Sequence, residues 1–164
     1  MIYSKTSGYA IRALGYLAAK SRNTPVGIKE LSKECRVSPS YLAKIFQVLA
    51  KEGLVSSQRG PLGGFTIIKD PQTISLWDVI QITDDAKRSP FSNCVMGLQE
   101  CGSHFPCMLH NEWTRMAKQI KTKLSRSTIQ DVARLRGPWK ASLGQRGVLS
   151  KKVKALFNVV GSVS

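Results

Sequence analysis

The spacing of apolar residues predicts a mainly helical chain that contains one short hairpin. Apolar positions three and four residues apart predict helices over residues 4–20, 28–35, 39–52, 74–82 and 110–126. A Ser/Thr pair at 127–128 predicts the start of a further short helix that runs to residue 135. Two extended runs, 54–58 and 65–69, flank a turn rich in glycine and proline, which predicts a β-hairpin.

Residues 38–69 are the stretch around which the chain is organised. Ser38 is a good helix N-cap and Pro39 a good first helical residue, because a hydroxyl satisfies an unpaired N–H and proline lacks one. Gly53 favours the left-handed conformation that ends a helix. The apolar face of this helix consists of Leu42, Ile45, Phe46 and Leu49. A short helix, a turn, this second helix and a glycine-rich hairpin together predict a winged helix-turn-helix, with the hairpin as the wing.

The charge of the chain favours a polyanionic partner. The 164 residues contain 25 Lys and Arg against 10 Asp and Glu, a formal charge of +15. Nucleic acid is favoured over a membrane surface as that partner. No apolar run reaches the ~18 residues of a membrane span. Lys5, Arg12 and Lys20 interrupt the apolar residues at the N-terminus, which indicates an amphipathic helix and not a signal peptide. We therefore expect a cytoplasmic protein that does not bind membranes.

The pattern divides the chain into four parts. We expect a winged helix-turn-helix domain at 1–85, a cysteine-containing loop at 86–109, a long helix with a short terminal helix at 110–135, and a basic tail at 136–164. The long helix carries an apolar stripe made of Trp113, Met116, Ile120 and Leu124. This stripe packs either on its own domain or on a second copy. A homodimer on a palindromic DNA operator is favoured, because such proteins read two half-sites about one helical turn apart.

A second informative stretch contains clustered thiols. Cys94, Cys101 and Cys107 are separated by six and then five residues, and His110 follows three positions after the last of them. Clustered thiolates are soft ligands that suit zinc or iron–sulfur clusters, and a redox disulfide or inert thiols are the alternatives. Structural zinc is less favoured, because closely spaced CxxC pairs are absent. Cys35 stands apart and is expected to be a small buried hydrophobe.

These motifs together resemble the IscR/NsrR/RirA family of bacterial iron–sulfur winged-helix transcription regulators. The resemblance covers roughly residues 1–135 and includes the run 8–10, the run 38–42, the wing 54–65 and the three downstream cysteines. It implies a non-enzymatic transcription regulator, a repressor by expectation, that dimerises through the long helix. It also implies an iron–sulfur cluster held by Cys94, Cys101 and Cys107.

The resemblance also bears on the fourth ligand and the cluster type. His110 matches the histidine of the IscR branch, which favours a [2Fe–2S] over a [4Fe–4S] cluster. The nitric-oxide-sensing branch can use an acid from the first helix of the partner, and this chain has Gly8 at that position. This chain departs from the family at two points. Its first cysteine gap has six residues where the family commonly has five, and Ala43 replaces a glutamate by which IscR discriminates its sites.

The DNA-contacting residues are likewise carried over from the resemblance. The helix predicted over residues 39–52 is the recognition helix, and the side chains of its N-terminal part point towards the major groove. The wing carries a basic residue towards the minor groove. The residues concerned are Ser38, Ser40, Tyr41 and Lys44 on the helix and Arg59, Gly60, Gly63 and Gly64 in the wing.

Two other functions remain open on the residues alone. One is a winged-helix regulator without a cluster, which uses thiol redox, zinc or a partner protein as its signal. The other is an iron–sulfur electron carrier or enzyme, which is disfavoured because no second catalytic constellation or small-molecule substrate site is evident and the helix–wing pattern would serve no purpose.

Overall fold

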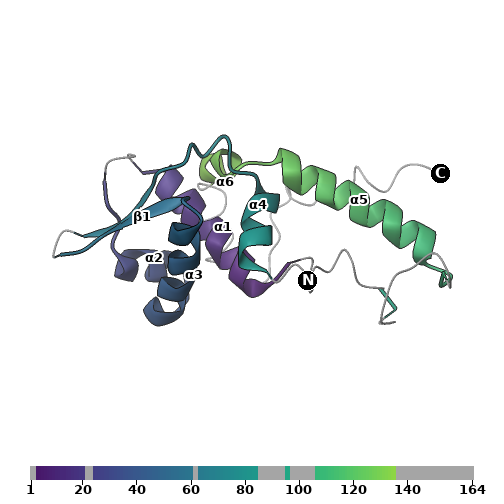
Figure 1. Ribbon diagram of the computed structural model, residues 1–164, viewed down its shortest axis with the longest axis horizontal. Helices are drawn as coiled ribbons and strands as arrows, with labels where there is room; N and C mark the ends of the chain where they lie inside the picture. Colours follow the sequence, from purple (N-terminus) through teal and green to yellow (C-terminus); the bar gives the residue numbers. More distant parts are fainter. Residues whose placement is uncertain (1–2, 21–23, 61–62, 85–94, 97–105, 136–164) are drawn as a thin grey trace.

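The computed structural model describes residues 3–20, 24–60, 63–84, 95–96 and 106–135 of the chain. These ranges contain a mostly helical body with one two-stranded antiparallel sheet and a long helix that projects from the body (Figure 1). The elements, in chain order, are α1 (Lys5–Ala18), α2 (Ile28–Cys35), α3 (Pro39–Lys51), β1 (Val55–Gln58), β2 (Gly64–Ile67), α4 (Leu76–Thr83), α5 (His110–Arg126) and α6 (Ile129–Arg134). The predicted winged helix-turn-helix fold with its small hairpin is confirmed. The predicted tail 136–164 lies outside the described residues.

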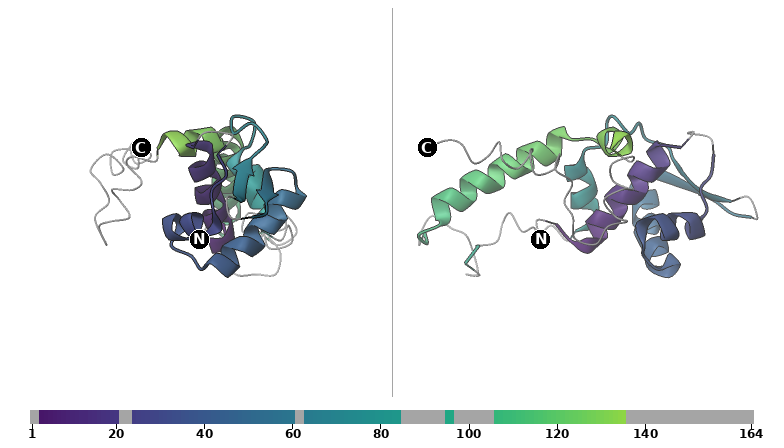
Figure 2. Two further views of the ribbon diagram at one scale, coloured as in Figure 1. Left: turned by 90° about the vertical axis from the view of Figure 1, so that its left-hand side faces the viewer. Right: turned by 180° about the vertical axis from the view of Figure 1, so that it is seen from behind.

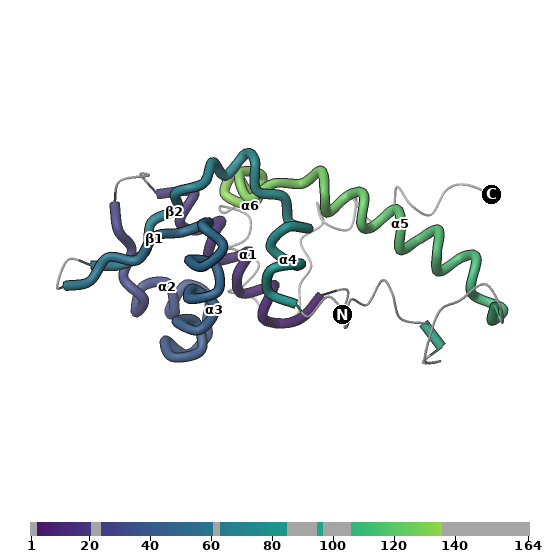
Figure 3. The backbone as a smooth tube through the Cα atoms, in the orientation of Figure 1, coloured from purple at the N-terminus to yellow at the C-terminus, as the bar shows by residue number. Residues whose placement is uncertain are grey.

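Helix α1 forms the centre of the body, and α2, α3, α4, α6 and β2 all contact it (Figure 3). The core that results is mainly aliphatic, with Phe46 fully buried and Tyr16 nearly so. The Phe46 ring lies 4.4 Å from the Phe65 ring of the hairpin, measured between centroids, with the two planes tilted by 47°. The predicted apolar face of α3 is confirmed, since Leu42, Ile45, Phe46 and Leu49 are all buried. Cys35 is fully buried among these side chains, as predicted.

The ends of the helices follow the capping residues of the sequence. The Ser38 hydroxyl accepts a hydrogen bond from the Tyr41 N–H at 3.4 Å, and Gly53 adopts φ = +69° just beyond α3. The prediction that the fourth helix begins at Ile74 is wrong, because α4 begins two residues later. A capping box sets its start: the Ser75 hydroxyl accepts from the Asp78 N–H at 3.0 Å, and the Asp78 carboxylate accepts from the Ser75 N–H.

The hairpin is pinned to the body at its base. Its register pairs Val55 with Ile67 and Gln58 with Gly64. Val26, in the connection before α2, forms an isolated bridge with Phe65. A Cβ on Gly64 would lie 2.6 Å from the Val26 carbonyl oxygen, so this close approach of two backbones requires glycine.

The last two helices differ in where they pack. Helix α5 extends away from the body, and α6 returns to lie against α1 (Figure 2). The return is tied by backbone hydrogen bonds from the Ile129 N–H to the Ile74 carbonyl and from the Leu76 N–H to the Ser127 carbonyl, both 2.9 Å. Ile129 is fully buried in the core as a result. Within the described part of the chain, no helix combines the length and apolar character needed to cross a bilayer.

Candidate functional site

The outer face of α3 carries the residues that were predicted to contact DNA. Ser38, Ser40, Tyr41 and Lys44 are all exposed, whereas the opposite face of the same helix is buried in the core. The hydroxyls of Ser38 and Ser40 lie 3.4 Å apart at the start of the helix. The first two turns of α3 therefore present hydroxyl groups and one ammonium group on a single surface, and such groups bond base edges and phosphates.

Tyr41 is held in place by α1, which the sequence did not predict. Its hydroxyl lies 2.6 Å from the Thr6 hydroxyl, and its ring meets the Tyr9 ring edge-on at 6.1 Å. The Arg12 guanidinium in turn lies 4.8 Å from the centroid of the Tyr9 ring. The side chain of Tyr41 is consequently oriented by contacts with a helix that is distant in sequence.

The wing places Arg59 at the exposed end of β1, next to a turn that requires glycine. Gly60 has φ = +114°, and its carbonyl accepts from the Gly63 N–H at 2.9 Å. A Cβ on Gly63 would lie 2.3 Å from the Gln58 carbonyl oxygen. The glycines thus allow the tight path of the hairpin, while their predicted contact with DNA stays a prediction.

Arg36 lies just before the recognition helix α3. The sequence predicts this position only as part of the turn between the two helices. It links α2 to α3 in the left-handed conformation, with φ = 53°, and its side chain is exposed. The backbone conformation places a further cation beside the start of α3. A left-handed residue other than glycine leaves no clear signal in a single sequence, so this position was missed.

Two of the four predicted metal ligands lie in a single turn. Cys107 and His110 flank the start of α5, where the His110 N–H donates to the Cys107 carbonyl at 3.0 Å and both side chains are partly exposed. Cys94 and Cys101 lie outside the described residues. Among the residues that the structure describes, no three Cys, His, Asp or Glu side chains converge on one point. A thiolate and an imidazole in one turn are a donor pair that fits an iron–sulfur cluster or zinc.

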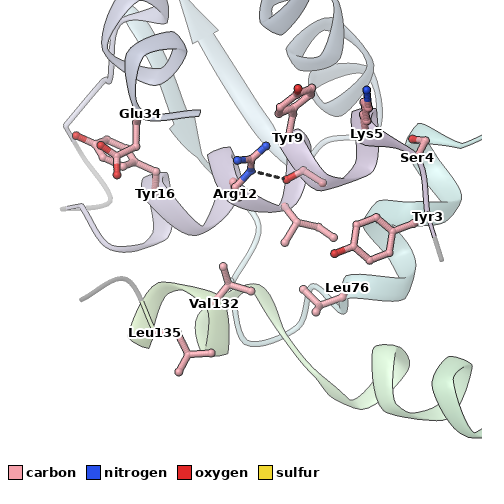
Figure 4. A pocket seen from close by; sticks show the side chains of 12 residues that line it. Tyr3, Ser4, Lys5, Tyr9, Arg12, Tyr16, Glu34, Leu76, Val132 and Leu135 are labelled. Atoms are coloured by element: carbon pink, nitrogen blue, oxygen red, sulfur yellow. Dashed lines mark hydrogen bonds between the residues drawn. The ribbon is translucent and has the colours of Figure 1, made fainter. Parts of the chain in front are cut away.

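A groove of 510 Å³ runs between α1, the start of α4 and α6 (Figure 4). Tyr9 and Arg12 line it on the α1 side and Val132 on the α6 side. Gly8, at the position where the resemblance expects an acid in one branch, also lines it. A Cβ on Gly8 would meet the Tyr3 ring at 3.5 Å, an ordinary contact, so packing in this chain does not require glycine there.

Comparison with known proteins identifies a family over most of the chain. The sequence profile named Rrf2, described as an iron-dependent transcriptional regulator, matches residues 3–135. An HTH-type transcriptional regulator of Aquifex aeolicus is 35% identical over 134 residues, which cover 80% of this chain and 91% of the relative. The HTH-type transcriptional regulator IscR of Yersinia enterocolitica is 32% identical over 124 residues, which cover 76% of this chain and 74% of the relative.

Solved structures share the same fold. CymR, the global cysteine regulator of B. subtilis, matches with a TM-score of 0.67 at 25% identity over 82% of this chain and 97% of that chain. IscR of T. potens matches with a TM-score of 0.63 at 24% identity over 82% of this chain and 87% of that chain. The second likeness supports the winged-helix fold alone.

Proposed function

Because the chain belongs to the Rrf2 family of transcriptional regulators, we propose that it is a homodimeric repressor that reads a palindromic DNA operator and senses its signal through an iron–sulfur cluster. The observation that carries the DNA-binding part is the two-faced helix α3. Its apolar side is buried, and Ser40, Tyr41 and Lys44 are exposed. The wing carries Arg59 in the turn between its two strands.

The dimer rests on the apolar stripe of α5. Met116 is 50% exposed, and Trp113, Ile120 and Leu124 are each partly exposed. A helix that leaves an apolar stripe exposed gains free energy when a second copy covers the stripe. Two copies joined through α5 would present two α3 helices to two half-sites of one operator.

The proposed cluster is supported by the chemical types of its proposed ligands. Cys94, Cys101, Cys107 and His110 are the proposed ligands, and three thiolates with one histidine favour [2Fe–2S] over [4Fe–4S]. When bound, such a cluster supplies a centre that responds to redox state, nitric oxide and iron supply. In this chain His110 occupies the first position of α5, so the ligands would connect the loop 86–109 to the proposed dimer helix. The regulator of Yersinia enterocolitica named IscR supports this assignment through its 32% identity.

Anaerobic purification followed by visible absorption and by iron and sulfide assays tests the cluster. About two irons and two sulfides per chain, absent in His110→Ala, support a [2Fe–2S] site with three cysteines and one histidine. Ala substitution of Cys94, Cys101 or Cys107 should also remove the iron but leave a folded dimer. A colourless protein after anaerobic reconstitution contradicts the cluster.

Operator binding by Arg59→Ala tests the DNA-binding assignment. We expect weaker binding, most of all on operators with a narrow minor groove, and a slope of log K against log [salt] that is smaller by about 0.9 for each phosphate that the protein no longer neutralises. Lys69→Ala, which removes an exposed cation at the base of the hairpin, is the matched control and should change the affinity less. Wild-type binding by Arg59→Ala contradicts the assignment of the wing.

A regulator without a cluster, which senses through its thiols, is the second candidate. The fold match to CymR supports a signal other than a cluster, because that protein is named the global cysteine regulator of B. subtilis and not an iron regulator. This candidate predicts a colourless protein whose operator affinity changes when thiols are oxidised or when a partner protein is added. The same absorption and iron measurements therefore separate the two functions.

A further inference from the structure

We propose that Asp84 is a positioning residue for DNA binding, which acts through α1 on Tyr41 of the recognition helix. This inference rests on the proposed function, because it concerns the surface of α3 that is assigned to DNA. It adds residues outside that surface: Asp84 just beyond α4, and Ser4, Thr6, Ser7 and Tyr9 at the start of α1.

The first step is the contact between the end of α4 and the start of α1. The Ser4 N–H donates to one carboxylate oxygen of Asp84 at 3.1 Å, and the hydroxyls of Ser4 and Ser7 donate to the other oxygen. The Ser7 hydroxyl also lies 2.8 Å from the Thr83 hydroxyl, and Ser7 is fully buried. A single carboxylate thus accepts three hydrogen bonds, two from the N-cap of α1 and one from its first turn, and fixes the orientation of this end of α1.

The second step runs from the same turn of α1 to α3. The Thr6 hydroxyl lies 2.6 Å from the Tyr41 hydroxyl, and the Tyr9 ring meets the Tyr41 ring at an interplanar angle of 86°. Tyr9 is itself covered by Arg12, whose Nε donates to the Gly8 carbonyl at 3.2 Å (Figure 4). Two independent contacts therefore set the direction of the Tyr41 side chain.

The geometry of a helix connects the contacts with Asp84 to the contacts with Tyr41. Ser7 and Tyr9 are two residues apart, which places them about 200° apart around the helix axis, on roughly opposite sides. The first turn of α1 accordingly stands between Asp84 on one side and Tyr41 on the other. A rotation of this turn, once released from Asp84, displaces Thr6 and Tyr9 together, and Tyr41 follows.

Fluorine NMR of protein labelled with 3-fluorotyrosine tests the connection directly. The chain has four tyrosines, so four resonances are expected, each assigned by its own Tyr→Phe variant. Asp84→Ala should shift the Tyr41 and Tyr9 resonances. The Tyr16 resonance serves as an internal reference, because the Tyr16 hydroxyl donates to Glu30 at the other end of α1.

Asp78→Ala is the matched control. Asp78 is a carboxylate on the same helix whose capping bond is to Ser75, so its removal also weakens α4 but leaves the start of α1 untouched. An unmoved Tyr41 resonance in a folded Asp84→Ala protein overturns the proposal, and so does an equal shift in Asp78→Ala. If Asp84→Ala does not fold, Thr6→Val removes a single surface hydroxyl and should shift Tyr41 in the same way.

Operator binding provides the second readout. We expect Asp84→Ala to weaken specific binding roughly 3- to 10-fold, the range that one net hydrogen bond accounts for. Combined with Tyr41→Phe, it should add less than the product of the two single effects, because both variants act through one side chain. Fully multiplicative effects overturn the proposal. If the wild type binds no operator, the proposed function fails, while the NMR result still decides the connection.

Discussion

The body of the protein and helix α5 bury their residues to very different extents. Eight of the 14 residues of α1 are buried, whereas Ala117 is the one buried residue among the 17 of α5. Both helices carry apolar residues at helical spacing. The difference is that α1 is surrounded by α2, α3, α4 and α6, while α5 meets its own chain chiefly near α4, where Lys121 lies 5.0 Å from the centroid of the Trp77 ring.

This difference separates two sources of stability. Packing of the body is internal to one chain and does not depend on protein concentration. In the proposed dimer, burial of the α5 stripe adds stability that depends on protein concentration.

The largest expected effect is in the body. Phe46→Ala should lower the free energy of unfolding by about 3–5 kcal/mol, because it leaves a cavity beneath Phe65. Guanidinium unfolding followed by circular dichroism measures it. Val48→Ala, on the same helix but 42% exposed, should stay within about 0.5 kcal/mol of the wild type. A loss under about 1 kcal/mol in Phe46→Ala contradicts the description of the core.

The next effect is on self-association through α5. Ile120→Glu should weaken the dimer about 100-fold or more, because it places a charge in an apolar contact. Sedimentation equilibrium measures the dissociation constant. Gln119→Glu adds the same charge at an exposed position of the same helix and should leave the constant nearly unchanged. Equal dissociation constants for Ile120→Glu and the wild type would show that the stripe is not the dimer interface.

A Gly→Ala substitution should change the free energy of unfolding in opposite directions at two glycines of α1. A Cβ on Gly15 would lie 2.6 Å from Val132 Cγ1 of α6, so Gly15→Ala should destabilise the protein by about 1–3 kcal/mol. Gly8 has room for a Cβ, and Gly8→Ala should stabilise the helix by about 0.5–1 kcal/mol. Thermal unfolding measures both changes. Stabilisation by Gly15→Ala would show that α6 is not packed tightly on α1.

The smallest effect is a pH dependence at α6. The Thr128 N–H, at 2.9 Å, and then the Thr128 hydroxyl donate to Asp131, which holds the pKa of that carboxyl below its usual value. A lowered pKa in the folded state stabilises the protein above about pH 4, and this contribution is lost as the pH falls through the folded value. Asp131→Asn should lower the free energy of unfolding at neutral pH by about 0.3–1 kcal/mol, since the side chain is half exposed, and should make stability less dependent on pH in the acid range. An unchanged acid slope would contradict the capping box.

Local patterns in the sequence predict most of the elements. The bounds of α2 and α5 agree with the structure because caps, polar turns and apolar spacing point to the same residues. At α4 they conflict: Ile74 fits the apolar spacing, but the capping box of Ser75 and Asp78 determines the start. Ile74 is instead buried in the extended segment that pairs with the chain around Ile129.

Contacts between distant residues could not be predicted in this way. The bonds between Ser4 and Asp84 span 80 positions, and the contact of Thr6 with Tyr41 spans 35. Hydroxyls and carboxylates of this kind are common on any surface, so no single-sequence pattern distinguishes the ones that meet. The docking of α6 on α1 is a similar case, since Ile129 and Val132 indicate a buried face without indicating its partner.

The close fit of Gly15 against Val132 has a mechanical consequence for the far end of α5. The turn with Cys107 and His110 lies at the end of that helix remote from the body (Figures 1 and 2). A helix of 17 residues is about 25 Å long, so it works as a lever: a tilt of about 5° at its base displaces the tip by about 2 Å. That displacement is as long as a metal–ligand bond. The precision with which α6 is seated on α1 therefore limits how precisely the turn with Cys107 and His110 is positioned relative to the body.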